Sequence, residues 1–106
     1  MPTYSFNNAT PFEAIQVGEY ISDDLAAMGM TQKELSQRTG IPAPHINQII
    51  KGKRRITAEQ SIAIAQIMGY EDALLYMLQA QHDIDKAKLA KQNDVKSSLL
   101  KIAAVL

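Results

Sequence analysis

The chain has 106 residues and no cysteine, and its 11 basic residues balance 11 acidic ones. This length suits a single domain with one hydrophobic core. The lack of cysteine excludes disulfides, thiolate metal ligands and cysteine nucleophiles. No apolar run reaches the roughly 18 residues of a membrane span, and the N-terminal residues lack the positive charge of a secretory signal. We therefore expect a cytoplasmic protein outside the membrane.

The charges fall into four blocks along the chain. Residues 33–55 have six basic residues and one acid, a net charge of +5, and residues 86–106 have +4. Residues 1–32 and 56–85 have −4 and −5. A segregated basic block is typical of a surface that faces a polyanion such as DNA. The alternative is that these charges mix in space and serve solubility.

The N-terminal part predicts a flexible tail and one helix. Residues 1–12 are rich in Asn, Thr and Ser near their start, which is typical of a loose terminus. The first helix is expected from about Pro11 to Met28, because apolar residues recur there at helical spacing. These are Val17, Ile21, Leu25 and Met28. Gly29 is expected to end the helix.

Two short helices follow. Thr31 and Glu34 have the spacing of a capping box, which begins the second helix, and Gly40 ends it. The third helix is expected between Pro42 and Lys51. Its inward side would consist of Ile46, Ile49 and Ile50.

The fourth helix begins with a second capping box, formed by Thr57 and Gln60, and ends at Gly69. Its body is apolar almost all round, which predicts a central buried helix. The fifth helix is expected to start near Glu71 or Asp72 and to extend through residue 84 toward residue 91.

The last segment, residues 92–106, is expected to form a separate amphipathic helix that Asp94 caps. Its apolar stripe consists of Val95, Leu99, Ile102 and Leu106. Three interpretations remain open for this stripe. It packs on the chain's own core, it pairs with a second copy or another protein, or it folds only when a partner arrives.

The segment from Gln32 to Lys51 has the pattern of a helix-turn-helix, two short helices joined by a turn that contains glycine. Leu35 lies inside the first of these helices, and Ser36 is small where the two helices cross. Gly40 suits a turn with positive φ. Several such positions in register, flanked by two capping boxes, favour this motif over chance.

The stretch TQKELSQRTGIPAPHINQIIKGKRRIT resembles the helix-turn-helix of the XRE superfamily, which includes the phage repressors. VGEYISDDLAAMGM resembles the first helix of the HigA-type antitoxins, and GKRRITAEQSIAIAQIMG and LLYMLQAQHDIDKAK resemble their fourth and fifth helices. The resemblance covers about residues 14–88. It implies an all-α, five-helix lambda-repressor-like domain, which we place at residues 13–91, with an extra C-terminal helix at 92–106.

The same resemblance implies a sequence-specific DNA-binding repressor. The protein would neutralise a small basic, mRNA-cleaving toxin of the HigB type and repress their shared operon. It would act as a homodimer on a palindromic operator in double-stranded DNA. The alternatives are a stand-alone or phage-type regulator without a toxin, and a protein-interaction adaptor that has lost DNA binding.

In this family the third helix enters the major groove of DNA. The resemblance implies that bases are read by Ala43, Pro44, His45, Asn47 and Gln48. It implies phosphate contacts from Gln32, Lys51, Lys53, Arg54 and Arg55. An amide has the donor and the acceptor that adenine requires, so Asn47 and Gln48 are the strongest candidates for base reading.

The sequence departs from the family pattern at the start of this helix. Pro42 replaces the usual capping Ser or Thr, and Pro44 removes another backbone N–H. Ala43 offers only a methyl group. Direct base reading is therefore expected to be thin, so binding would depend on dimerisation.

No enzyme, cofactor or metal site is expected. The two histidines, His45 and His82, belong to different predicted helices, and nothing in the sequence marks further ligands near either one. No nucleophile is paired with a base, and there is no glycine-rich phosphate loop.

Overall fold

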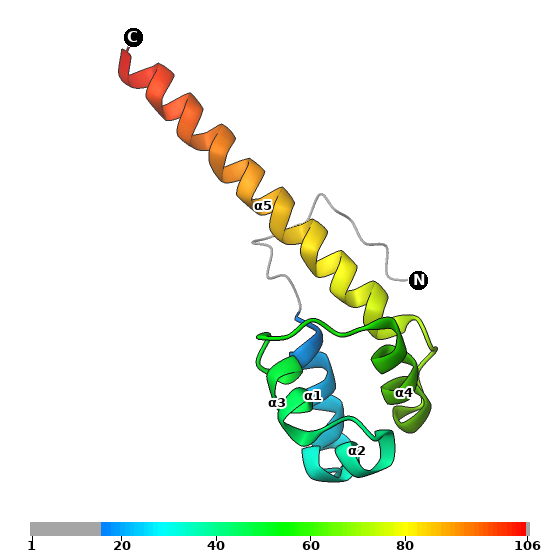
Figure 1. Cartoon of the computed structure of the whole chain (residues 1–106). Coiled ribbons are helices and arrows are strands. Elements are labelled where there is room, and N and C mark those ends of the chain that lie inside the picture. The colour runs from blue at the N-terminus through cyan, green and yellow to red at the C-terminus, as the bar shows by residue number, and fades with distance from the viewer. Residues whose placement is uncertain (1–15, 106) are drawn as a thin grey trace.

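The computed structural model describes residues 16–105, which form five α-helices and no strand (Figure 1). The fold is all-α, as predicted. The predicted tail at residues 1–12 and the predicted helix start at Pro11 lie outside the described residues. The helices are α1 (Val17–Met28), α2 (Gln32–Thr39), α3 (Ala43–Ile50), α4 (Ala58–Met68) and α5 (Leu74–Val105). Four helices and the first turns of α5 form one body, from which the rest of α5 projects.

Both predicted capping boxes form. The Thr31 hydroxyl accepts a hydrogen bond from the Glu34 N–H at 3.1 Å, and the Glu34 carboxylate accepts one from the Thr31 N–H at 3.4 Å. Thr57 and Gln60 make the same reciprocal pair, both bonds at 3.1 Å. Each box stabilises its helix by about 1 kcal/mol, so the starts of α2 and α4 are set by local sequence.

One core joins the helices and the loops between them. Its buried residues are Val17, Ile21, Leu25, Leu35, Ile41, Ile46, Ile49, Ile56, Ile64, Met68 and Leu75. The predicted inner faces of α1 and α3 are confirmed, with Ile50 partly buried against this core. Met28 is the exception, because it is the last residue of α1 and is half exposed.

The backbones of α1 and α3 approach closely at Gly18. A Cβ atom added at Gly18 would lie 2.1 Å from the carbonyl oxygen of Ile50 and 2.7 Å from that of Ile49. Both neighbours are backbone atoms, which cannot move aside as the end of a side chain can. The packing of α3 on α1 therefore requires glycine at this position.

The prediction of a central buried α4 is wrong. This helix packs on α2 and α5 with one side, where Ser61, Ile64, Ala65 and Met68 are buried. Ile62 faces outward and is exposed. In a body of this size each helix keeps a solvent side, and an apolar residue is often left there.

The prediction of a separate C-terminal helix is also wrong. Residues 92–105 continue α5, which starts at Leu74 rather than at Glu71 or Asp72, and Asp94 lies inside it instead of capping it. The stretch after Leu74 contains no glycine or proline and is rich in Ala, Leu, Lys and Gln, which favour a continuous helix. Although α5 is long, no described helix is long and apolar enough to cross a membrane.

Replacing Gly18 by alanine tests the close approach of α1 and α3. We expect Gly18→Ala to lower the free energy of unfolding by about 3 kcal/mol or more, because the new methyl group overlaps backbone atoms of α3. Urea denaturation measures this loss. Gly40→Ala is the control, since it meets no atom within 4 Å and only strains a positive φ, at about 1–2 kcal/mol. A smaller loss for Gly18→Ala than for Gly40→Ala would contradict the packing.

Candidate nucleic-acid interface

The turn between α2 and α3 is held by side-chain hydrogen bonds. Gly40 has φ +76°, as the motif predicts. The Ser36 hydroxyl donates to the carbonyl of Ile41 at 2.6 Å, and the Thr39 hydroxyl accepts from the Ile41 N–H at 3.2 Å. Ser36 thus anchors the turn, beyond its predicted role as a small residue. These bonds fix the angle of α3 relative to α2.

The predicted base-reading residues lie on the outer side of α3. Ala43 and Pro44 are exposed, and His45, Asn47 and Gln48 are half-buried. Pro42 precedes the helix without a side-chain cap, and its carbonyl accepts hydrogen bonds from the N–H groups of residues 45 and 46. Proline is tolerated in this first turn because the N–H groups there have no acceptor inside the helix.

Each candidate amide makes one hydrogen bond within the chain. The Nδ2 of Asn47 donates to the Oε1 of Gln32 at 3.2 Å, which connects α3 to the start of α2. The Nε of Arg54 donates to the Oε1 of Gln48 at 2.8 Å. Both amides are therefore oriented before any ligand is bound. Asn47 keeps its oxygen and one N–H for further bonds, and Gln48 keeps its NH₂ group.

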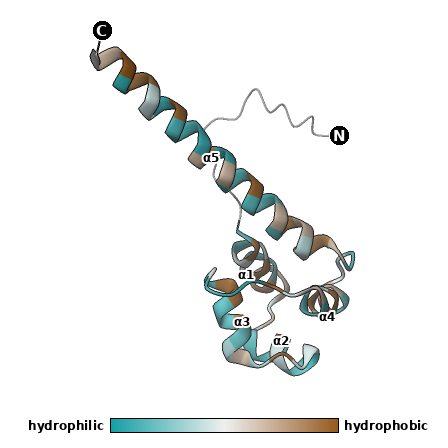
Figure 2. Ribbon diagram, turned by 45° about the horizontal axis from the view of Figure 1, so that its top comes forward, coloured by the Kyte–Doolittle hydropathy of each residue, from teal (hydrophilic) through white to brown (hydrophobic). Residues whose placement is uncertain are grey.

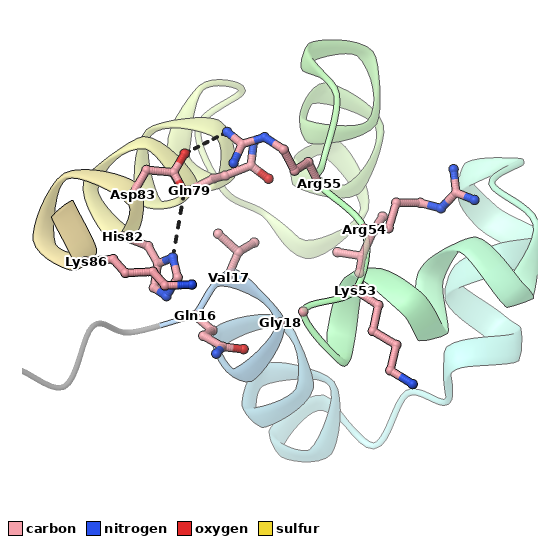
Figure 3. Close-up of a pocket in the computed structure, with 12 residues that line it drawn as sticks. Gln16, Val17, Gly18, Lys53, Arg54, Arg55, Gln79, His82, Asp83 and Lys86 are labelled. Carbon is pink, nitrogen blue, oxygen red and sulfur yellow. Dashed lines mark ion pairs between the residues drawn. The ribbon is translucent and has the colours of Figure 1, made fainter. Parts of the chain in front are cut away.

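The side chains of the basic turn, residues 51–55, point in two directions. Lys51, Lys53 and Arg54 are exposed beside the end of α3. Figure 3 shows the side chains of Lys53 and Arg54 directed away from α5, whereas Arg55 points toward α5. The Nη2 of Arg55 lies 2.7 Å from the Oδ2 of Asp83. This arrangement argues against the predicted phosphate contact of Arg55.

Both side chains of the Arg55–Asp83 ion pair are exposed. The hydrogen bond from Arg55 holds the pKa of the Asp83 carboxyl below its usual range and raises the pKa of the Arg55 guanidinium. Solvent screens such pairs, so this one orients Arg55 more than it stabilises the fold.

Gln79 is a positioning residue that the sequence did not reveal. Its Oε1 accepts from the Ile56 N–H at 2.7 Å, and its Nε2 donates to the Ile56 carbonyl at 3.0 Å. Through these two bonds the buried Gln79 fastens the chain directly after the basic turn to α5. The spacing of Gln79 could have indicated its burial, because a residue four positions after Leu75 lies on the same buried side of the helix.

A cavity of about 270 Å³ lies between the start of α1, the basic turn and α5 (Figure 3). His82, Asp83 and Lys86 of α5 line one side of it, and Lys53, Arg54 and Arg55 of the basic turn line another. In the described part of the chain, no three His, Asp or Glu side chains gather in a way that could hold a metal ion.

This combination of a hydrogen-bonded turn, a partly exposed α3 and adjacent cations defines a helix-turn-helix DNA-binding regulator. The sequence pattern of the helix-turn-helix family matches residues 21–75, which is 55 of the 106 residues. The chain belongs to this family and is of its XRE type. No curated protein sequence matches it.

Several solved structures share the fold. A HigA-family addiction module antidote protein from Coxiella burnetii has a TM-score of 0.72 at 24% identity, over 81% of this chain and 95% of that one. The antitoxin HigA of Pseudomonas aeruginosa, solved with the higBA promoter, has a TM-score of 0.69 at 21% identity, over 80% and 94%. The structure of PA4674 from P. aeruginosa in complex with its 28-bp operator DNA has a TM-score of 0.71 at 21% identity, also over 80% and 94%.

The anchor at Gln79 can be tested by replacing it with methionine, which has a similar shape but cannot replace its hydrogen bonds. We expect Gln79→Met to lower the free energy of unfolding by about 2–4 kcal/mol, because the N–H and the carbonyl of Ile56 each lose a partner. Thermal and urea denaturation measure the change. The control is Gln92→Met at an exposed position of α5, expected to change stability by less than about 0.5 kcal/mol. Equal losses for the two variants would show that Gln79 does not anchor Ile56 to α5.

Proposed function

We propose that this protein is a sequence-specific DNA-binding repressor and the antitoxin of a HigB/HigA-type toxin–antitoxin pair. It would act in the cytoplasm, neutralise an mRNA-cleaving toxin and repress its own operon. The observation that carries the DNA-binding part is the exposed outer side of α3 next to the cations of the basic turn. The antitoxin part is supported by structural similarity to HigA antitoxins, of which one was solved with its promoter.

In the proposed complex α3 lies in the major groove, and Ala43, Pro44, His45, Asn47 and Gln48 face the bases. The Nε of Arg54 donates to the oxygen of Gln48, so the NH₂ group of Gln48 stays available for a further hydrogen bond. An NH₂ donor suits the acceptors of guanine or the O4 of thymine. This modifies the expectation from sequence, in which the amide would bind adenine through both its atoms.

Phosphate contacts in this proposal come from Lys51, Lys53 and Arg54, with Gln32 at the start of α2. Arg54 would bind a phosphate through the guanidinium nitrogens that its bond to Gln48 leaves available. The hydrogen bond between Arg54 and Gln48 would then couple binding of the DNA backbone to base reading.

The proposal includes a symmetric dimer. Ala43 and Pro44 offer few groups to the bases, so one α3 helix would give modest affinity. Two copies on a palindrome would combine two such contacts, with half-sites about one DNA turn apart or a multiple of it.

The first test is binding to the DNA upstream of the protein's own gene, measured by fluorescence anisotropy across a salt series with a scrambled duplex as control. We expect tighter binding to the upstream duplex, with an affinity that falls steeply as salt rises. Equal or absent binding on the two duplexes would contradict the repressor and favour the adaptor.

Variants within one turn test the assigned roles. Lys53→Ala should weaken binding to all sequences alike and lower the salt slope by about one, because it removes a phosphate contact. Arg55→Ala, two residues away, should leave the slope unchanged because Arg55 faces Asp83. Asn47→Ala combined with Gln48→Ala should reduce discrimination by about 1–3 kcal/mol per base contact. A change of base preference in Lys53→Ala would refute this division.

The antitoxin assignment needs a separate test, because a stand-alone regulator would give the same DNA results. We expect the product of a short neighbouring gene to co-purify with this chain, and co-expression to relieve its toxicity. Full DNA binding without such a partner would favour the regulator that has no toxin.

A further inference from the structure

One side of α5 changes from apolar to polar where it passes the basic turn. Leu75 is fully buried in the core. The residues that follow it on the same side of the helix, at spacings of four, three and four, are Gln79, His82 and Lys86. Figure 2 shows hydrophilic residues recurring along α5 as it leaves the other helices. Core packing would favour apolar residues on this side, so it does not account for His82 and Lys86.

These polar side chains form one wall of the cavity of about 270 Å³, and the start of α1 and the basic turn form the others (Figure 3). Among the described residues that line it there are four Lys or Arg and one acid, a net charge of +3 with His82 neutral. A concave site lined mainly by one sign of charge attracts ions of the opposite sign. The lining of this cavity therefore favours an anion.

The single acid, Asp83, leaves most of this positive charge available. The Oδ2 of Asp83 lies 2.7 Å from the Nη2 of Arg55. A guanidinium has five N–H donors, so Arg55 keeps others for a ligand while Asp83 holds it beside α5. Lys86 makes no ion pair with another residue of the range 16–105. Two cations from different walls of the cavity can therefore donate to one ligand.

His82 adds a third donor beside these cations. Its side chain is only 21% exposed, and its Nδ1 lies 3.9 Å from the Oδ1 of Asp83, which is too long for a hydrogen bond. Its Nε2 can therefore carry the proton of the neutral ring and donate it. His82 and Lys86 are four residues apart, so their Cβ atoms lie about 5–6 Å from each other on α5. Figure 3 shows both side chains extending from α5 toward the start of α1.

We propose that this cavity binds a small phosphate monoester. A monoester group has three terminal oxygens and a charge of about −1.5 to −2 at neutral pH. Arg55, His82 and Lys86 supply three donors, one for each oxygen. The cavity is slightly smaller than sites for drug-sized ligands, so it has room for a phosphate with a small organic group. This site goes beyond the proposed function, in which none of the three residues contacts DNA.

Two other anions fit these donors less well. A carboxylate has two oxygens, and the carboxylate of Asp83 already occupies one side of the Arg55 guanidinium. A phosphodiester of the DNA backbone has two free oxygens and one negative charge. Either anion would leave one of the three donors without a partner. The donor set therefore favours the monoester.

An NMR titration of the full chain without DNA tests the site. The probes are methyl phosphate for a monoester, dimethyl phosphate for a diester and acetate for a carboxylate, all at one ionic strength. We expect methyl phosphate to shift the backbone amide signals of Arg55, His82 and Lys86 and to bind at least about 10-fold more tightly than the other two. Equal binding of the three probes, or no binding of methyl phosphate, would overturn the proposal.

Two substitutions on α5 test the donors. Lys86→Met keeps the length of the side chain without its charge, and His82→Phe keeps a ring without its nitrogens. Each should weaken methyl phosphate binding by about 10-fold or more, because one hydrogen bond to a charged group is lost. The matched control is Lys91→Met, at an exposed position that does not line the cavity and lies about 140° from Lys86 around the helix axis. Equal effects of Lys86→Met and Lys91→Met would show general charge attraction and overturn the site.

The same variants distinguish a small ligand from the DNA backbone. Lys86→Met should keep the full salt slope of binding to the upstream duplex, because the proposal gives Lys86 no DNA phosphate. A slope lowered by about one would assign the cavity to a DNA phosphate and overturn the small ligand.

The NMR titrations use no DNA and no toxin, so they fail independently of the proposed function. A chain that binds methyl phosphate as expected but not the upstream duplex would refute the repressor and support the site. Specific duplex binding without methyl phosphate binding would do the reverse. Circular dichroism of each variant checks that the helical body is retained.

Discussion

The close approach of α1 and α3 is the constraint on which the rest of the structure depends. Gly18 lies against the last carbonyls of α3, where a single methyl group would overlap them. Because α1 also packs on α5, and α3 on α2, this contact sets how deeply α3 lies in the body. Ile46 and Ile49 are buried behind it. The polar residues of α3 are consequently presented on its outer side.

The basic turn shows how a buried polar contact organises exposed charges. Gln79 binds both backbone groups of Ile56, and it is buried, so these bonds are not exchanged for water. With Ile56 fastened to α5, Arg55 is brought within reach of Asp83, one turn further along that helix. Lys53 and Arg54 lie before the anchor and are directed away from α5. Cations that are neighbours in sequence thereby point in different directions.

The fifth helix packs in the body only with its first turns. Its first turns complete the core through Leu75 and hold the basic turn through Gln79. Its remaining length leaves the body, and every residue from Lys86 to Ala104 is exposed.

Local sequence by itself determined the ends of most elements and the position of the motif. Capping boxes at Thr31 and Thr57, glycines after α1, α2 and α4, and the apolar spacing of α1 and α3 act over three or four residues, where the chain has few alternatives. Tertiary structure alone decided which side of α4 is buried, and that Arg55 faces Asp83 while Arg54 binds Gln48. These outcomes depend on contacts between different elements of the fold. Periodicity cannot encode such contacts, because it records the residues on one helix and not the surface that meets them.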